Sequence, residues 1–274
     1  MIATAEHPND VAEALTGRSY LSVSAVKTFM KCPLAYKAKY IDKLPENSVS
    51  SALAFGRSIH ASVEIWFRAR LEGMTEPTTD DLLSEFWDEW KACEQEKEVR
   101  LGKNEDVTKV ADTAARVIEA FTDSDAARPE GSIVGIEEEL RAPLLANVPD
   151  VLGRLDLAVE SDDVIKVVDF KTAKSKWSDA QRQDAELQGV IYAELARTFA
   201  GAKPVQVEFI VVTKTKTPSV TIEQVDTSDR AIERGKAIMA AVWQAIQTGN
   251  FFPSPSIMSC PTCPYRSRCE AWTG

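Results

Sequence analysis

The first half of the chain has the periodicity of amphipathic helices. Apolar residues recur three and four positions apart in residues 21–41, 51–71, 79–97 and 106–127. Ser22 or Ser24 is a suitable N-cap for the first of these segments, and Pro33 interrupts it where the first turn of a second short helix can begin. Trp87 and Trp90 keep the helical spacing, so we expect them in the core and not on a surface that stacks on bases.

The second half alternates strands with helices. Short apolar runs predict strands at residues 133–145, 151–159, 164–170, 205–213 and 219–225. Helices are predicted at residues 178–199, with Ser178 as N-cap, and at residues 228–248. The pattern therefore predicts an α/β fold with a mixed central sheet flanked by helices.

Two acids interrupt neighbouring strands of this sheet. Asp156 and Asp169 lie among apolar residues on the two sides of a polar turn, which predicts a hairpin carrying both carboxylates. A buried carboxylate is costly unless it is compensated, and two acids held together suit a hard divalent cation. Lys171 shares a strand face with Asp169 because side chains alternate with period two. The sequence therefore predicts that two carboxylates and one ammonium group converge.

Three short motifs occur here in a fixed order: G-x-x-D ending at Asp156, V-V-D-F-K-T containing Asp169 and Lys171, and Q-G-V-I-Y from Gln188 to Tyr192. This arrangement resembles the PD-(D/E)XK nucleases, specifically their RecB-like branch. The resemblance implies that Asp156 and Asp169 hold Mg²⁺ or Mn²⁺ and that Lys171 assists the attacking water. It assigns Gln188 and Tyr192 to substrate contacts beside the metals.

The same resemblance extends towards the N-terminus. The motif F-G-x-x-x-H ends at His60, which the resemblance makes a metal ligand together with a backbone carbonyl near Phe170. Strand alternation places Glu138 on the inward face of its predicted strand, where it could be an additional acid near the metals. Solvation of Glu138 on an edge strand is an equal alternative.

The net charge of -10 argues against a nucleic-acid partner if the sum alone is considered. The distribution changes this, because acids concentrate in residues 72–106 whereas five lysines cluster near the start, at Lys27, Lys31, Lys37, Lys39 and Lys43. The N-terminal sequence has neither a basic start nor an apolar run, and no segment reaches membrane-spanning length. We expect a cytoplasmic protein that binds DNA and no membrane.

Five cysteines in a chain without a secretory signal argue against a disulfide framework. Cys260, Cys263 and Cys269 form C-x2-C-x5-C, which places three thiolates within reach of one centre, whereas Cys93 stands apart as a structural thiol. Structural zinc and a [4Fe-4S] cluster both accept four thiolates. The pattern S-x-S-x-x-x-T-F-x-x-C-P-x-x-Y-K-x-K-Y from Ser22 resembles RecB-like nucleases of the AddB and CRISPR-adaptation types. That resemblance implies Cys32 as the fourth ligand and a cluster as the occupant.

The predicted organisation is a restriction-endonuclease-like core with a helical insertion and an iron–sulfur-stapled terminal element. Residues 1–20 form a polar segment, and residues 21–274 a single nuclease domain. Within it we expect a helical lobe at about 51–130, a catalytic core at about 131–226, and a terminal helix with the cysteine motif at 227–274.

The resemblance implies a metal-dependent exonuclease acting on single-stranded or frayed DNA ends. Recombination and repair, phage DNA metabolism and CRISPR spacer acquisition are settings that fit such an enzyme, and a helicase or recombinase is a fitting partner. Two alternatives remain open: a weakly active or non-catalytic DNA-binding subunit of such a complex, and a zinc-stabilised interaction module. Strand polarity and sequence preference do not follow from the sequence.

Overall fold

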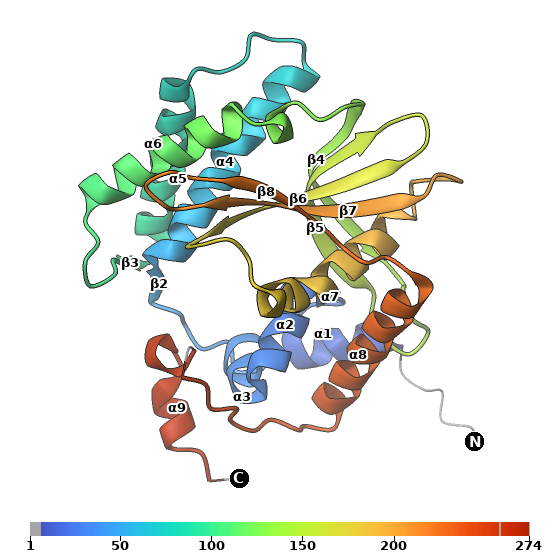
Figure 1. Ribbon diagram of the computed structural model, residues 1–274. Helices are drawn as coiled ribbons and strands as arrows, with labels where there is room; N and C mark the ends of the chain where they lie inside the picture. Colours follow the sequence, from blue (N-terminus) through green and yellow to red (C-terminus); the bar gives the residue numbers. More distant parts are fainter. Residues whose placement is uncertain (1–6, 258, 274) are drawn as a thin grey trace. The chain divides into compact units, whose positions relative to one another are not determined.

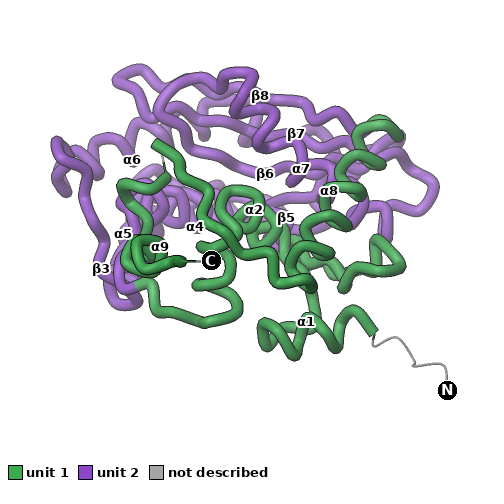
Figure 2. Tube along the Cα trace, turned by 90° about the horizontal axis from the view of Figure 1, so that it is seen from below, with its two compact units in different colours: residues 1–46, 139–153, 228–274 green, residues 47–138, 154–227 purple. Residues whose placement is uncertain are grey.

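The computed structural model describes residues 7–257 and 259–273. The chain divides into two compact units (Figure 2), each assembled from separate stretches of sequence. Unit 1 comprises Met1–Glu46, Glu139–Gly153 and Ser228–Gly274, and unit 2 comprises Asn47–Glu138 and Arg154–Thr227. Every residue predicted to hold the metals or to contact the substrate beside them lies in unit 2, whereas the four cysteines assigned to one centre and the five lysines near the start of the chain lie in unit 1.

The centre of unit 2 is a mixed β-sheet (Figure 1). In the sheet β5, β6, β7 and β8 follow one another and β4 pairs with β5. The β5–β6 and β7–β8 pairs are antiparallel hairpins, whereas β6 and β7 are parallel and are connected through helix α7. The strands are β4 (Ser132–Ala142), β5 (Val151–Glu160), β6 (Ile165–Ala173), β7 (Val205–Thr213) and β8 (Val220–Gln224), and α7 is Asp179–Ala196. This confirms the predicted α/β class with a mixed sheet.

Three helices cover one face of this sheet, namely α4 (Ser51–Leu71), α5 (Thr79–Glu96) and α6 (Val107–Thr122). Their apolar faces form one core with Val168, Phe170, Ile210 and Val212 of the sheet. Trp90 is almost fully buried in this core and Trp87 packs against it, so the prediction that these tryptophans are core residues is confirmed. Two short strands, β2 (Ser48–Ser50) and β3 (Glu98–Arg100), pair in parallel beside the helices.

Helix α7 packs through a second core that contains Ala173, Ala185, Phe209 and Val211. The helix comes close to the segment after β8, because a Cβ on Gly189 would lie 2.6 Å from a methyl carbon of Val225. Alanine at this position would require Val225 or the helix to shift. Gln188 and Tyr192 lie in the buried second half of the same helix.

Unit 1 is mainly helical. Ser22 caps α2 as predicted, since its hydroxyl accepts a hydrogen bond from the backbone N–H of Ala25, and Pro33 begins α3. The strand β1 pairs in parallel with the first residues of β5. The elements are α1 (Pro8–Thr16), β1 (Leu21–Ser22), α2 (Val23–Lys31), α3 (Pro33–Tyr36), a π-helical turn at Lys37–Ile41, α8 (Asp229–Gln247), a 3-10 turn at Cys260–Thr262 and α9 (Arg266–Glu270). Helix α1 lies inside the segment that was expected only to be polar.

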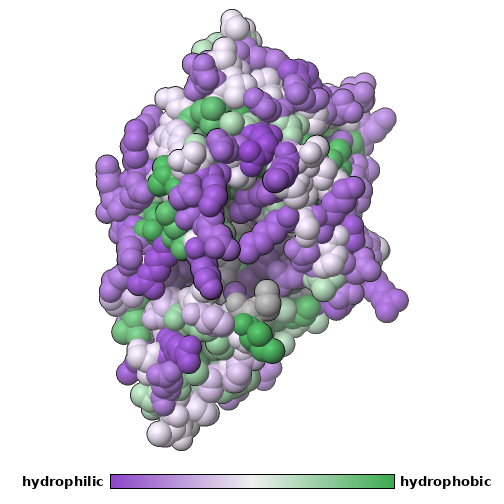
Figure 3. Space-filling view, turned by 60° about the vertical axis from the view of Figure 1, so that its left-hand side comes forward, coloured by the Kyte–Doolittle hydropathy of each residue, from purple (hydrophilic) through white to green (hydrophobic). Residues whose placement is uncertain are grey.

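The surface drawn in Figure 3 is mostly hydrophilic, and hydrophobic side chains form only small separate areas on it. Among the described residues, no helix is both long enough and apolar enough to span a bilayer.

Candidate functional site

The β5–β6 hairpin brings the two predicted acids together. Leu157 pairs with Val168 in the antiparallel register, so Asp156 and Asp169 stand opposite each other one step further along. Opposite residues of an antiparallel pair project from the same face. The hairpin therefore explains why two acids that are 13 residues apart in sequence share one site.

Asp169 is held between a lysine and an amide. Its side chain is 2 % exposed, one carboxylate oxygen forms an ion pair with the Lys171 ammonium, and the other accepts a hydrogen bond of 2.8 Å from Gln188 Nε2. The same Gln188 nitrogen donates to the Tyr192 hydroxyl at 2.9 Å. Gln188 and Tyr192 are one helical turn apart on α7, so both reach the hairpin from the same side of the helix.

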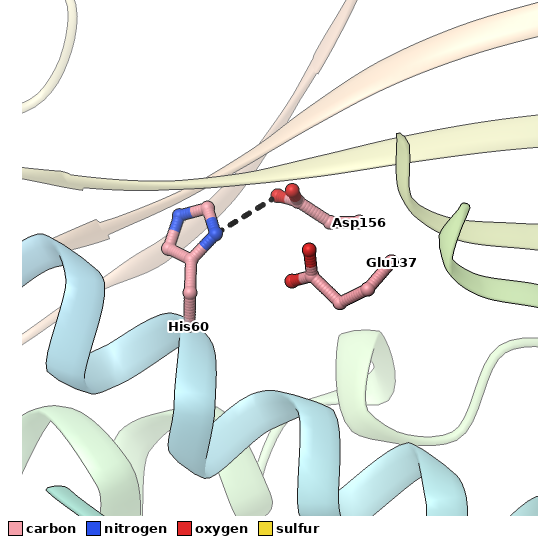
Figure 4. A group of neighbouring side chains, drawn as sticks. All are labelled: His60, Glu137 and Asp156. Atoms are coloured by element: carbon pink, nitrogen blue, oxygen red, sulfur yellow. Dashed lines mark ion pairs between the residues drawn. The ribbon is translucent and has the colours of Figure 1, made fainter. Parts of the chain in front are cut away.

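Asp156 lies beside His60 of helix α4 (Figure 4). Its Oδ2 accepts a hydrogen bond of 2.7 Å from the backbone N–H of Phe170 and lies 3.3 Å from His60 Nδ1. The other ring nitrogen, Nε2, is 2.7 Å from the backbone carbonyl oxygen of Phe170. The structure thus places His60 against two of the three groups predicted to share the metals with it, Asp156 through Nδ1 and the Phe170 carbonyl through Nε2.

A third acid was missed by the sequence reasoning. Glu137 offers a carboxylate oxygen that lies within 4.8 Å of ligand atoms of both His60 and Asp156 (Figure 4). Glu138, which strand alternation placed on the inward face, is exposed instead. The reason is local: Glu137 has a φ of 54°, and both Gly135 and Ile136 are buried, so regular alternation fails in the middle of β4. Of the two alternatives left open for Glu138, the structure shows the solvated one, and the acid beside His60 and Asp156 is Glu137.

The ionisation of these groups reflects how tightly they are packed. Burial opposes the charge on His60, but Asp156 outweighs it and raises the pKa of His60 to about 9. Burial, reinforced by Asp156, raises the pKa of Glu137 to about 7. Burial also raises the pKa of Asp169, whereas the pKa of Asp156 is lowered because His60 and Lys171 together outweigh its burial. The raised pKa values of Glu137 and Asp169 show that these carboxyls lack enough nearby positive charge to offset their burial.

The donor set fits a divalent metal. Among the described residues, His60, Glu137 and Asp156 form the one group of three or more side chains whose ligand atoms lie within 4.8 Å of one another. Two carboxylates, an imidazole and the carbonyl of Phe170 are ligands that Mg²⁺ or Mn²⁺ accepts. Asp169, predicted as a ligand, lies opposite Asp156 but outside this group of three, with its carboxylate bound to Lys171 and Gln188.

Replacing Glu137 with glutamine is expected to weaken Mn²⁺ binding by about 10- to 100-fold, because a carboxylate near the metal is lost. The exposed Glu138 one residue later provides a matched control: Glu138→Gln removes the same charge and should leave affinity unchanged. Calorimetric titration of the metal-free protein with Mn²⁺ measures both variants. Equal losses in the two would show that Glu137 acts only through overall charge.

The cysteine motif lies around a cavity in unit 1. A cavity of about 300 Å³ is lined by Cys32, Cys260, Cys263 and Cys269, together with Tyr265. The four side chains are all partly exposed and form no disulfide, whereas Cys93 is buried in unit 2. The structure therefore brings Cys32 to the C-terminal motif, across more than 200 residues of sequence.

The four sulfurs surround this cavity without meeting at one point. Among the described residues, no three of these sulfurs lie within 4.8 Å of one another. Tetrahedral zinc with Zn–S bonds of about 2.3 Å would hold them roughly 3.8 Å apart. Burial and the neighbouring Cys32, Cys260 and Cys263 raise the pKa of the Cys269 thiol. Thiolates packed this way repel one another unless a cationic centre separates them.

Comparisons with known proteins agree with this geometry. The family described as the PD-(D/E)XK nuclease superfamily matches residues 20–270. A crystal structure from Eubacterium rectale, of a protein named as a candidate exonuclease, shares 16% sequence identity with a TM-score of 0.56 over 99% of this chain and 92% of that chain. The crystal structure of SSO0001 aligns with 83% of this chain and 88% of the SSO0001 chain at 12% sequence identity. Its TM-score of 0.38 is too low to carry an argument. No curated protein sequence matches the chain.

Proposed function

Since the chain belongs to the PD-(D/E)XK nuclease superfamily, we propose that it is a divalent-metal-dependent deoxyribonuclease of the RecB-like branch that degrades DNA from its ends. The observation that carries this proposal is the convergence of His60, Glu137, Asp156, Asp169 and Lys171 in one site of unit 2. A purely structural network would not need three carboxyls around one buried hairpin, because each buried charge adds a desolvation cost.

In this proposal His60, Glu137 and Asp156, with the carbonyl oxygen of Phe170, hold Mg²⁺ or Mn²⁺, and Asp169 supplies a further carboxylate. Such a cation polarises a phosphate oxygen and lowers the pKa of a bound water. The protein's own groups would complete the site: the Lys171 ammonium would offset the negative charge that develops on the phosphate, and Gln188 fixes Asp169 through its amide. Tyr192, whose hydroxyl accepts a hydrogen bond from Gln188, would contact the substrate strand.

Lys171 acts as a charge stabiliser in this scheme and not as a base. Burial tends to lower the pKa of its ammonium, but the neighbouring Asp169 and Asp156 outweigh burial and raise it. The side chain therefore stays protonated at neutral pH.

Unit 1 would hold a [4Fe-4S] cluster on Cys32, Cys260, Cys263 and Cys269. The cavity of about 300 Å³ that the four cysteines line supports a polyatomic centre, which needs more room than a single ion. The role of the centre would be structural. It would tie helix α3, which follows Cys32, to the C-terminal segment around α9.

End-dependence can be tested with two substrates of identical sequence, linear and circular single-stranded DNA. With Mn²⁺ present, the purified protein should degrade linear DNA to short products, whereas circular DNA should remain intact because it has no end. Electrophoresis of labelled DNA gives the readout, and EDTA should stop the reaction. Cleavage of both forms at equal rates would overturn the exonuclease assignment and leave an endonuclease. Binding without cleavage of either form would favour the non-catalytic DNA-binding subunit.

A further inference from the structure

Two lysine-bearing segments meet at the ends of the parallel strands that follow the catalytic hairpin. Strand β6 runs through Asp169 and Lys171 and continues into Lys174 and Lys176, and β7 continues into Lys214 and Lys216. Ala173 pairs with Thr213 in the ladder, and the backbone N–H of Lys214 donates to the Ala173 carbonyl oxygen at 2.7 Å. Lys174 and Lys214 are therefore neighbours at one edge of the sheet.

The segment that carries Lys214 and Lys216 is fixed by the threonines between them. Thr213 Oγ1 accepts a hydrogen bond from the backbone N–H of Ser219 at 2.9 Å, and Thr215 Oγ1 donates to the carbonyl oxygen of Thr217 at 2.6 Å. The hydroxyls are thus used within the turn. The lysines, which alternate with them in the sequence T-K-T-K-T, are left out of this network.

None of these four lysines forms an ion pair within the part of the chain that the structure describes. Four other lysines of unit 2 do have acidic partners: Lys91 pairs with Asp88 and Lys109 with Asp106, and Lys166 and Lys203 pair with Glu208 and Glu160. Two adjoining segments thus carry four lysines without ion pairs in a chain with a net charge of -10.

Lys214 is the most constrained of the four. Its ammonium lies 4.8 Å from the centre of the Phe55 ring, and burial, with a further contribution from Lys174, lowers its pKa although Glu105 acts in the opposite direction. Glu105 is otherwise engaged, because its carboxylate accepts hydrogen bonds from the Ser51 hydroxyl and the Gly102 backbone N–H. An ammonium that is partly desolvated next to a second lysine gains most from an external anion.

We propose that Lys174, Lys176, Lys214 and Lys216 bind the phosphodiester backbone of a single DNA strand next to the metal site. The proposal rests on the proposed nuclease function, which makes the metal site the point that the bound DNA strand must reach. Phe55, which Lys214 contacts, and His60 are five residues apart on α4, which corresponds to about 7.5 Å of helix. A short stretch of DNA would therefore reach from these lysines to the bond that is hydrolysed.

Between these two positions the end of β6 lies against α4. A Cβ placed on Gly56 would be in ordinary contact with the Thr172 hydroxyl, at 4.0 Å. Gly56 and Thr172 are both partly exposed, so small or polar groups lie at the surface between His60 and Lys214.

The test compares two double variants that remove the same charge. The track variant, Lys174→Gln/Lys214→Gln, changes two of the four lysines proposed to bind the DNA backbone. The control variant, Lys91→Gln/Lys109→Gln, changes two lysines of α5 and α6 that already have acidic partners. Binding of a fluorescent oligothymidylate is measured in EDTA at several salt concentrations. For single strands each phosphate contact contributes about 0.7 to the slope of log affinity against log salt. The track variant should lose roughly 1.4 of this slope and bind about tenfold more weakly at low salt, while the control keeps the wild-type slope.

Equal slopes for wild type and the track variant would overturn the proposal, as would equal losses in both double variants. Displacement of the oligonucleotide by thymidine monophosphate at the same phosphate concentration would also overturn it, because a single-phosphate pocket would then explain the binding. Since EDTA prevents cleavage, these results do not depend on catalysis. A wild-type protein that shows the expected slopes but cleaves no DNA with Mn²⁺ would refute the proposed nuclease activity alone.

Discussion

Lys171→Met is expected to slow DNA cleavage by about 10²- to 10³-fold, the range measured when one preorganised stabilising group is removed from an active site. The ammonium of Lys171 is in contact with Asp169 and stays charged between the two acids of the hairpin. Methionine keeps an unbranched side chain that is one heavy atom shorter and removes the charged ammonium group. Single-turnover cleavage of linear DNA with saturating Mn²⁺ measures the rate, and binding of the same DNA in EDTA should change by less than about threefold because one of several cationic contacts is lost.

A control for stability is required because Lys171 also compensates a buried acid. Asp169 is 2 % exposed, and removing one partner of a buried ion pair costs about 3–5 kcal/mol. The double variant Asp169→Asn/Lys171→Met leaves no unpaired charge and should recover much of the melting temperature without recovering cleavage. If the single variant cleaves at the wild-type rate, Lys171 has only a structural role. If the double variant regains activity, the loss in the single variant came from instability.

Cys260→Ala is expected to remove most of the bound iron and to lower the melting temperature by roughly 10 °C. A lost stabilisation of about 3 kcal/mol shifts the melting temperature of a domain of this size by about 6–12 °C. The physical reason is that metal binding by ligands from distant parts of a chain contributes directly to folding free energy. Iron analysis, the visible absorption spectrum and thermal melting of anaerobically purified protein give three independent readouts.

Cys93 provides the matched control for this experiment. It is buried in the helical core of unit 2 and is not among the residues that line the cysteine cavity. Cys93→Ala should therefore retain full iron content, even if core packing is weakened. If the wild-type protein contains stoichiometric zinc and no iron, the site is a zinc site and the cluster assignment is wrong. If the melting temperature of Cys260→Ala is unchanged, the cysteines do not stabilise the fold.

The sequence was sufficient for most of the local structure. Helix α4 begins and ends at the predicted residues. Helix α2 begins directly after Ser22, and α6 and α8 begin within one residue of their predicted starts. These starts are local features, because N-caps such as Ser22 and Ser228 satisfy free backbone N–H groups in any context. The β5–β6 hairpin also followed from local information, since two apolar runs and a polar turn define its register. That register alone places Asp156, Asp169 and Lys171 together.

Tertiary structure decided the parts of the site that depend on contacts across the chain or on unusual backbone angles. Strand alternation selected Glu138 as the inward acid, whereas the backbone has a positive φ at Glu137 and the Glu137 carboxylate lies near His60. A period-two rule assumes regular extended backbone and cannot predict where that regularity is interrupted. The contact of His60 with the carbonyl oxygen of Phe170 joins residues 110 positions apart. The pairing of β6 with β7, which sets Lys174 beside Lys214, likewise depends on a crossover through α7. Sequence periodicity reports on local geometry, but the packing of distant elements is set by the summed free energy of the whole fold.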